Sequence, residues 1–197
     1  FDTSQTVQLG EDLWEFTGGV LGRGAFGVVL DARSTSRDHR AAVKIIDTRS
    51  MSAWQARQSE SEISLWSTLN HPNIVQVYVV GSVDSIHYLV QELIDGENLR
   101  QSLDRKGVIG TEEAIEVLVG VASALEVASE AGITHRDIKP ENVMLTKAGH
   151  VKLVDFGLSV PLPDCEYFDF AMTIDRQRQG GTRAGPRSHH FGRRRCR

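Results

Sequence analysis

Residues 135–142 read His-Arg-Asp-Ile-Lys-Pro-Glu-Asn, and the tripeptide Asp-Phe-Gly follows at residues 155–157. Together they supply a carboxylate at Asp137, an amide at Asn142 and a second carboxylate at Asp155. These groups can meet one polyphosphate, because one acid can position a hydroxyl group while the amide and the other acid hold magnesium ions. The two stretches therefore predict phosphoryl-transfer chemistry in the second half of the chain.

A glycine-rich stretch at residues 22–29 reads Gly-Arg-Gly-Ala-Phe-Gly-Val-Val. Alone, this spacing is weak evidence, because dinucleotide-binding folds place similar glycines between a strand and a helix. Here the apolar residues that follow continue as a strand, so the glycines form a strand–turn–strand flap whose backbone N–H groups can approach phosphates. A plain hairpin turn would leave three glycines at this spacing unexplained.

Lys44 lies inside an apolar stretch that is predicted to form a strand. A lone lysine there more often marks a strand edge, because burying an ammonium group costs free energy unless an anion compensates it. Glu62, on the inward face of a predicted helix with Trp66, is a suitable anion. Such a pair at 4 Å is worth on the order of 4 kcal/mol before desolvation is subtracted. We predict that this pair holds Lys44 against phosphate groups.

The first half of the chain has the apolar pattern of strands, interrupted by one helical pattern. The predicted strands cover residues 13–21, 28–33, 41–46, 74–80 and 86–93, and the predicted helix covers residues 52–69. Pro72 ends the helical region, since the residue before a proline avoids the helical conformation. The pattern predicts a five-stranded sheet with one helix.

After Gly96 the apolar spacing becomes helical. Thr111 is the expected N-cap of a long helix that ends near Gly132. The apolar stripe of this helix comprises Ile115, Leu118, Val119, Ala122, Leu125 and Ala128. Short strands are expected at residues 143–145 and 151–154. This order predicts an α+β fold in two lobes.

Taken in order, the glycine-rich stretch, the strand lysine, the loop at residues 135–142 and the tripeptide at residues 155–157 resemble the eukaryotic protein kinase family. The resemblance runs over about residues 13–182. It implies a two-lobed protein-kinase-like fold, with a small lobe of five-stranded antiparallel sheet plus one helix and an incomplete, mainly helical large lobe. The implied division is a small lobe and hinge at 1–94, a partial large lobe with catalytic and activation loops at 95–182, and a basic tail at 183–197 that we expect to be disordered.

The resemblance implies an ATP-dependent serine/threonine protein kinase, which transfers the γ-phosphoryl group of ATP to a Ser or Thr hydroxyl of a protein substrate. Asp137 resembles the catalytic base, and Lys139 resembles the lysine that neutralises the transferring group. Lys44 would contact the α- and β-phosphates and pair with Glu62. The implied ligands of Mg²⁺ are Asn142 and Asp155.

The same resemblance assigns the residues that would bind ATP. Those implied to cover the phosphates are Gly22, Arg23, Gly24, Ala25, Phe26 and Gly27. Those implied to enclose the adenine ring are Leu21, Val29, Ala42 and Met144, with Gln91 as gatekeeper, Glu92, Leu93 and Ile94 as the hinge, and Asn98 near the ribose. The implied apolar stack of the active state is Trp66, Val77, His135 and Phe156, and Thr173 is a candidate phosphorylation site of the activation loop.

The resemblance breaks after residues 180–182, Gly-Gly-Thr, where family members run on to an Ala-Pro-Glu tripeptide. Residues 183–197 instead hold six arginines and no acidic residue. We expect this end to be a frameshift, a mis-spliced end or a truncation, and Phe1 suggests that the chain was cut from something longer. The stripe of the long helix would then be partly exposed and the isolated chain marginally stable.

A second hypothesis keeps the fold without the chemistry. In it, the chain is a catalytically incompetent, truncated kinase fragment that acts as a nucleotide-binding or interaction module. The discriminating observation is nucleotide-dependent stabilisation without phosphate transfer.

Composition bears on other classes of protein. The 197 residues carry a formal net charge of −4, and the tail's six arginines leave −10 on the remainder, so nucleic-acid binding is not expected. Two cysteines, Cys165 and Cys196, exclude a disulfide framework, and His189 and His190 beside Cys196 are more simply coincidence than a zinc site. No stretch reaches the roughly 18 apolar residues of a membrane span, so the expected location is cytoplasmic or nuclear.

Overall fold

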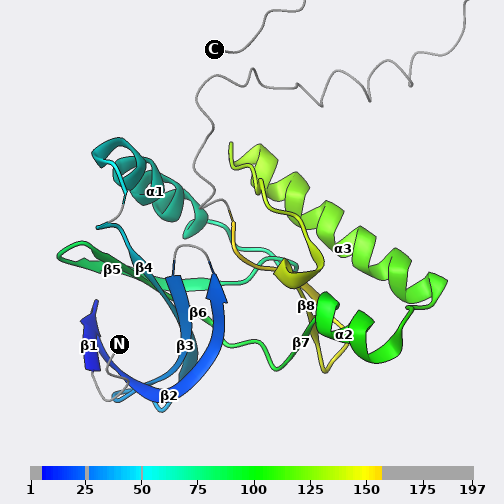
Figure 1. Cartoon of the computed structure of the whole chain (residues 1–197), viewed down its shortest axis with the longest axis horizontal. Helices are drawn as coiled ribbons and strands as arrows, with labels where there is room; N and C mark the ends of the chain where they lie inside the picture. The colour runs from blue at the N-terminus through cyan, green and yellow to red at the C-terminus, as the bar shows by residue number, and fades with distance from the viewer. Residues whose placement is uncertain (1–5, 25–26, 50, 157–197) are drawn as a thin grey trace, which may run out of the picture. The chain divides into compact units, whose positions relative to one another are not determined.

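The computed structural model describes residues 6–24, 27–49 and 51–156, apart from the side chains of Gln55, Gln58, Ser61 and Glu62. Two sheets and the helices that pack on them make up this part of the chain (Figure 1). The elements in chain order are β1 (Thr6–Leu9), β2 (Asp12–Gly24), β3 (Gly27–Ser34), β4 (Arg40–Asp47), α1 (Ala53–Trp66), β5 (Val77–Val83), β6 (Ile86–Glu92), β7 (Gly96–Asn98), α2 (Leu99–Lys106), α3 (Thr111–Glu130), the 3₁₀ turn η1 (Pro140–Asn142), β8 (Val143–Thr146) and β9 (Val151–Leu153).

The larger sheet is antiparallel and has the strand order β1-β2-β3-β4-β6-β5. The smaller sheet has the order β7-β8-β9. The predicted two-lobed α+β fold is therefore confirmed. The larger sheet has one strand more than the five predicted, because β1 pairs with β2 and buries Val7 and Leu9 on alternate positions.

The central strands of the larger sheet are buried on both faces. Val43 and Ile45 of β4 pack with Trp14 and Phe16 of β2 in a cluster on one face. The next residue along β4, Ile46, belongs to a second cluster that includes side chains of α1, α3 and β9. Since successive side chains of a strand point to opposite faces, the near-continuous apolar run of β4 is what two-sided burial requires. The second cluster joins the two lobes into one core.

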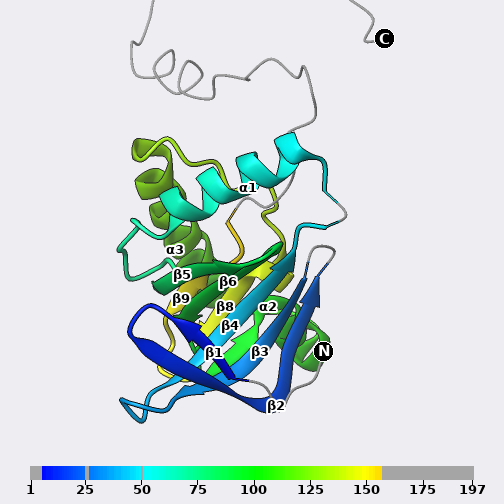
Figure 2. The ribbon, with the colours of Figure 1, turned by 90° about the vertical axis from the view of Figure 1, so that its left-hand side faces the viewer.

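Two boundaries differ from the predicted ones for a tertiary reason. Strand β5 begins at Val77 and not at residue 74, because Ile74 forms a parallel bridge with Leu153 of β9. The amide of Val75 also donates to the Leu153 carbonyl at 3.0 Å, and the Leu153 amide donates to the Asn73 carbonyl at 2.8 Å. These bonds tie the segment before β5 to the smaller sheet. Helix α1 covers 53–66 within the predicted 52–69, and Figure 2 shows it beside the larger sheet.

Helix α2 directly follows β7 and begins with a capping box between Asn98 and Gln101. Helix α3 begins at Thr111, so the prediction that Thr111 is the N-cap is wrong. The N-cap is Gly110, which makes no side-chain hydrogen bond to the helix. The backbone of Gly110 is extended there, as an N-cap requires, and Thr111 is the first helical residue.

Helix α3 is apolar on two faces, and only one of them is buried in the described part of the chain. Its buried residues are Val117, Gly120, Ala124 and Ala128. A Cβ atom at Gly120 would lie 2.8 Å from the Cβ of Val151, so glycine allows the helix to approach β9 closely. The leading part of the predicted stripe faces outward, with Ile115, Leu118 and Val119 exposed by 54%, 68% and 63%.

Candidate active site

The register of the larger sheet gathers several predicted site residues on one face. Lys44 lies opposite Val29 of β3 and opposite Leu89 of β6, and Ala42 lies opposite Gln91. Directly paired residues share a face, as do residues two apart on one strand. Val29, Ala42, Lys44 and Gln91 therefore all face the same side of the sheet. The side-chain oxygen of Gln91 is buried and has no hydrogen-bond partner among the described residues.

Lys44 is nearly buried and pairs with Asp155. Its Nζ donates to Asp155 Oδ1 at 2.8 Å, and the exposed fractions of the two side chains are 11% and 35%. Asp155 has a φ of 61°, a left-handed conformation that a residue with a Cβ atom rarely adopts without constraint from its surroundings. Glu62, the predicted partner of Lys44, lies in α1, but its side chain is outside the described part of the structure.

Asp137 forms a compact cluster with two other predicted residues. Lys139 Nζ donates to Asp137 Oδ2 at 2.6 Å, and Asn142 Nδ2 donates to Asp137 Oδ2 at 3.0 Å and to the Asp137 carbonyl at 2.9 Å. The hydrogen bond from Lys139 is the main reason that the pKa of Asp137 lies below its ordinary value. The same bond raises the pKa of Lys139. Both groups are therefore charged at neutral pH.

Backbone bonds connect this cluster to Asp155. The amide of Val154, the residue before Asp155, donates to the Asn142 carbonyl at 2.9 Å. The carbonyl of Val154 lies 2.9 Å from Nε2 of His135, which is buried. Burial lowers the pKa of His135 and favours its neutral form. The loop at residues 135–142 and the segment that ends at Phe156 are thus held together around Lys44, Asp137, Asn142 and Asp155.

An aromatic stack includes Phe156, which directly follows Asp155 in the chain. The ring of Phe156 lies 4.7 Å from that of His135 and 5.9 Å from that of Trp66, measured between centroids. All three are buried, and so is Val77. Because Trp66 comes from α1 and His135 from the loop before η1, the stack joins the helix of the small lobe to the loop that carries Asp137.

The glycine-rich stretch forms the end of the β2–β3 pair, where Gly24 lies opposite Gly27 and Gly22 opposite Val29. A Cβ atom at Gly27 would lie 2.0 Å from the carbonyl oxygen of Ile45, so this position accepts only glycine without a shift of backbone. A Cβ atom at Gly22 would meet nothing within 4 Å. Arg23 is exposed. The predicted phosphate-covering residues Ala25 and Phe26 lie outside the described residues.

The remaining predicted nucleotide residues fall on both sheets and on the connection between them. Leu21 is exposed on β2, and Met144 is half-buried on β8 opposite Asn98. Glu92 ends β6, and Ile94 of the following connection packs against the shared core. The side-chain oxygen of Asn98 accepts the amide of Gln101 at 2.8 Å as the cap of α2. A ribose contact at Asn98 would therefore fall to its amide nitrogen.

Other predictions concern residues that the structure does not describe. These are the candidate phosphorylation site Thr173, the tail at residues 183–197, the break at residues 180–182, and the tail residues His189, His190 and Cys196. The structure likewise describes Asp155 and Phe156 of the Asp-Phe-Gly tripeptide, but not its glycine.

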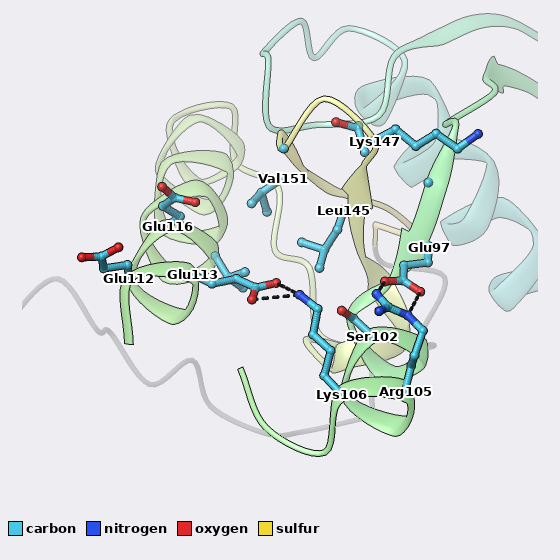
Figure 3. Close-up of a pocket in the computed structure, with 14 residues that line it drawn as sticks. Glu97, Ser102, Arg105, Lys106, Glu112, Glu113, Glu116, Leu145, Lys147 and Val151 are labelled. Atoms are coloured by element: carbon cyan, nitrogen blue, oxygen red, sulfur yellow. Dashed lines mark hydrogen bonds and ion pairs between the residues drawn. The ribbon is translucent and has the colours of Figure 1, made fainter. Parts of the chain in front are cut away.

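A cavity of about 670 Å³ lies apart from this site, between α2, the start of α3 and the β8–β9 turn (Figure 3). Lys106 reaches Glu113 across it at 2.7 Å, and Arg105 pairs with Glu97. The hydrogen bond from Arg105 lowers the pKa of Glu97. These lining charges compensate one another, and none of the predicted nucleotide residues lines the cavity.

The fold is a two-lobed α+β domain, and comparison with known proteins identifies its family. The sequence matches the protein kinase domain family over residues 17–175. The chain therefore belongs to the protein kinase family. Within the described residues, no helix has both the length and the apolar character needed to cross a membrane.

Curated relatives include serine/threonine protein kinases of bacteria. A "Probable serine/threonine-protein kinase" of Streptomyces coelicolor is 42% identical over 153 residues, which cover 75% of this chain and 23% of that protein. The serine/threonine-protein kinase PrkC of Bacillus subtilis is 33% identical over 145 residues, covering 73% of this chain and 22% of PrkC. The chain thus spans less than a quarter of the length of these relatives.

A solved structure shows the same fold. The crystal structure of Rad53 residues 1–466 in complex with AMP-PNP superposes with a TM-score of 0.67 at 30% sequence identity. The similarity covers 74% of this chain and 38% of the Rad53 chain.

Proposed function

We propose that this chain carries the ATP-binding and phosphoryl-transfer residues of a serine/threonine protein kinase, with a protein hydroxyl as the acceptor. The observation that carries the proposal is the convergence of Lys44, Asp137, Asn142 and Asp155, which come from β4, the loop before η1, η1 itself and the segment after β9. Membership of the protein kinase family and the complex of Rad53 with AMP-PNP support ATP as the ligand.

The donor set fits a magnesium ion. Asn142 uses its amide nitrogen to hold Asp137, so its amide oxygen is left to accept a cation. Asp155 uses Oδ1 to accept Lys44, which leaves Oδ2. Amide and carboxylate oxygens beside a polyphosphate are the ligands that Mg²⁺ prefers. When bound, Mg²⁺ would neutralise charge on the phosphates.

Asp137 is suited to orient the acceptor hydroxyl. Its lowered pKa keeps it ionised, so it can accept a hydrogen bond from a Ser or Thr hydroxyl. The hydroxyl oxygen forms a bond to the γ-phosphorus, the bond from that phosphorus to the oxygen of ADP breaks, and Asp137 accepts the hydroxyl proton. A carboxylate of low pKa is a weak base, which suits a loose transition state in which positioning matters more than full deprotonation. Lys139 would supply positive charge beside the transferring group.

The division proposed for the chain is the one predicted from its sequence: a small lobe and hinge at 1–94, a partial large lobe at 95–182 and a basic tail at 183–197. A non-catalytic nucleotide-binding or interaction module is the second candidate. The exposed residues Ile115, Leu118 and Val119 favour it, because they leave part of the apolar surface of α3 available to another protein.

The test is transfer of radiolabelled phosphate from Mg·ATP to a generic basic protein, with Asp137→Asn as the matched variant. We expect the chain to transfer phosphate, and we expect Asp137→Asn to lose at least about 100-fold in rate while retaining its affinity for Mg·ATP. Saturable binding of Mg·ATP with no transfer would favour the binding module. Absence of saturable Mg·ATP binding would overturn the kinase proposal and the nucleotide-binding form of the module.

A further inference from the structure

A second ion pair, between Lys152 and Glu92, joins the two sheets. Lys152 lies in β9, and Glu92 is the last residue of β6. Lys152 Nζ lies 2.9 Å from Glu92 Oε2, and the side chains are 16% and 26% exposed. At such partly buried positions the attraction is screened less than at the surface, and removal of one partner leaves a poorly compensated charge.

Each partner is attached to an element that the proposed function assigns to ATP. Glu92 begins the predicted hinge at residues 92–94. Lys152 lies directly opposite Met144, one of the residues predicted to enclose the adenine ring, and the two side chains share a face of the smaller sheet. The ion pair therefore ties the first hinge residue to the strand pair that would support the adenine ring.

Few other contacts hold the Glu92 side chain. Among the described residues, its carboxylate accepts one further hydrogen bond, from the amide of Gln76 at a long 3.4 Å. The Glu92 amide donates to the Gln76 carbonyl at 2.8 Å. Without Lys152, the carboxylate would gain by turning toward water, because a partly buried anion with one long hydrogen bond is poorly solvated. The start of the hinge, which directly follows Glu92, would then lose this attachment to β9.

We propose that Lys152 is a positioning residue for nucleotide binding. Its ion pair with Glu92 fixes the hinge at the distance from Met144 that an adenine ring requires. This inference rests on the proposed function, since it assumes that the hinge reads an adenine. Fixing a binding element in advance raises affinity because less freedom is lost when the ligand binds.

Substitution of Lys152 leaves the fold in place. The bridge between Ile74 and Leu153 and the neighbouring backbone bonds hold β9 independently of the ion pair. Leu153 is fully buried in the shared core, whereas the Lys152 side chain is not part of that core. A methionine matches the apolar stem of the lysine, so Lys152→Met removes the charge with little change in packing.

The experiment measures dissociation constants for Mg·ATP and for adenosine by calorimetry, using the full chain and its variants. Lys152→Met should weaken both ligands by the same factor, roughly tenfold, because the affected contacts are to the adenine and not to the phosphates. Lys152→Arg should restore most of the affinity. The control is Lys147→Met, which breaks the exposed ion pair of Lys147 with Asp95 next to the same hairpin and should leave both constants unchanged.

A double-mutant cycle with Glu92→Gln tests whether the two residues act together. The double variant should bind no more weakly than Lys152→Met alone, because the pair is already lost. If the unsubstituted chain binds Mg·ATP and Lys152→Met binds both ligands as tightly, the positioning role is overturned and the proposed function stands. A fall in melting temperature without a change in affinity, or a loss confined to ATP, also overturns it. If the unsubstituted chain binds neither ligand, the proposed function itself is overturned.

Discussion

Lys44 Nζ donates to Asp155 Oδ1 at 2.8 Å, although the two residues are 111 positions apart in the chain. Under the proposed function, the two residues bind oppositely charged parts of Mg·ATP. When Mg·ATP binds, Lys44 would gain the phosphate oxygens as partners, and Asp155 would gain the metal ion through Oδ2. The pair keeps both charges compensated when no nucleotide is bound, which reduces the cost of holding Lys44 inside the sheet.

Lys44→Met should abolish transfer and lower stability slightly. Methionine fills the space of the lysine stem, but it leaves the Asp155 carboxylate without its cation. Because Asp155 is about a third exposed, water compensates much of this loss, and the free energy of unfolding should fall by about 1 kcal/mol. Urea denaturation and the phosphate-transfer assay measure the two effects. Lys106→Met, which breaks an exposed ion pair with Glu113, is the control, and a fully active Lys44→Met would contradict the role of Lys44.

Gly27→Ala and Gly22→Ala should differ in stability although both alter the glycine-rich stretch. A Cβ atom at position 27 would overlap the Ile45 carbonyl, so alanine forces β3 and β4 apart and should cost about 1–3 kcal/mol. At position 22 the space is open, so we expect a change within about 0.5 kcal/mol. Thermal melts of the two variants test this. Equal melting temperatures would show that the close contact between Gly27 and the Ile45 carbonyl does not determine the stability of the chain.

His135 should make stability depend on pH below neutrality. Burial lowers its pKa in the folded chain, whereas the unfolded chain titrates near an ordinary value of about 6.5. Between these two pKa values the unfolded chain binds the additional proton, so the free energy of unfolding decreases as pH falls from about 6.5 toward the folded pKa. Above about 6.5 this contribution is fully present.

Denaturation at pH 7.5 and pH 5.5 measures this dependence. His135→Gln should reduce the difference between the two conditions, and replacement of the exposed His150 by Gln is the control for the substitution itself. An unchanged difference in His135→Gln would show that other groups cause the pH dependence.

The exposed face of α3 should control association more than stability. Replacing Ile115, Leu118 and Val119 with glutamine removes apolar surface that contacts little, so the free energy of unfolding should change by no more than about 0.5 kcal/mol per site. Light scattering should show less aggregation of the triple variant. Val117→Ala on the buried face is the contrast, with an expected loss of about 2 kcal/mol. Undiminished aggregation of the triple variant would assign the association to another surface.

The apolar pattern of the sequence predicted helices and strands well where each apolar run is clearly bounded by turn residues. The strands around Lys44 and the hairpin at β8–β9 were predicted within a few residues, because their apolar runs are bounded by turns. Strand β1 was missed because four residues with two buried side chains carry little signal. Strand β5 was predicted to begin three residues too early. Ile74 has the apolar character of a strand residue, but it pairs with Leu153 and not within the larger sheet.

Contacts between distant segments could not be predicted from periodicity. The residues Asp137, Lys139 and Asn142 lie within one short stretch, so the motif predicted their shared site, whereas the hydrogen bonds among them came from the structure. The pairs Lys44–Asp155 and Lys152–Glu92 join segments that are far apart in the chain, so no spacing in the sequence predicts them. The stripe of α3 was assigned to one face, but apolar residues occur around most of this helix, so its pattern did not identify Val117 and Gly120 as the buried side.

The connection at residues 93–95 between β6 and β7 has a consequence for motion. Glu92 lies at one end of β6. Gly27 pairs with Ile46, which pairs with His87 near the other end of β6, about 17 Å from Glu92 along the strand. The bridge at Leu153 anchors the sheet close to the Glu92 end. If one lobe rotates on the other about this connection, atoms near the proposed adenine site move little because they lie close to the axis. The glycine-rich stretch lies farther from the axis, so the same rotation displaces it by a larger distance.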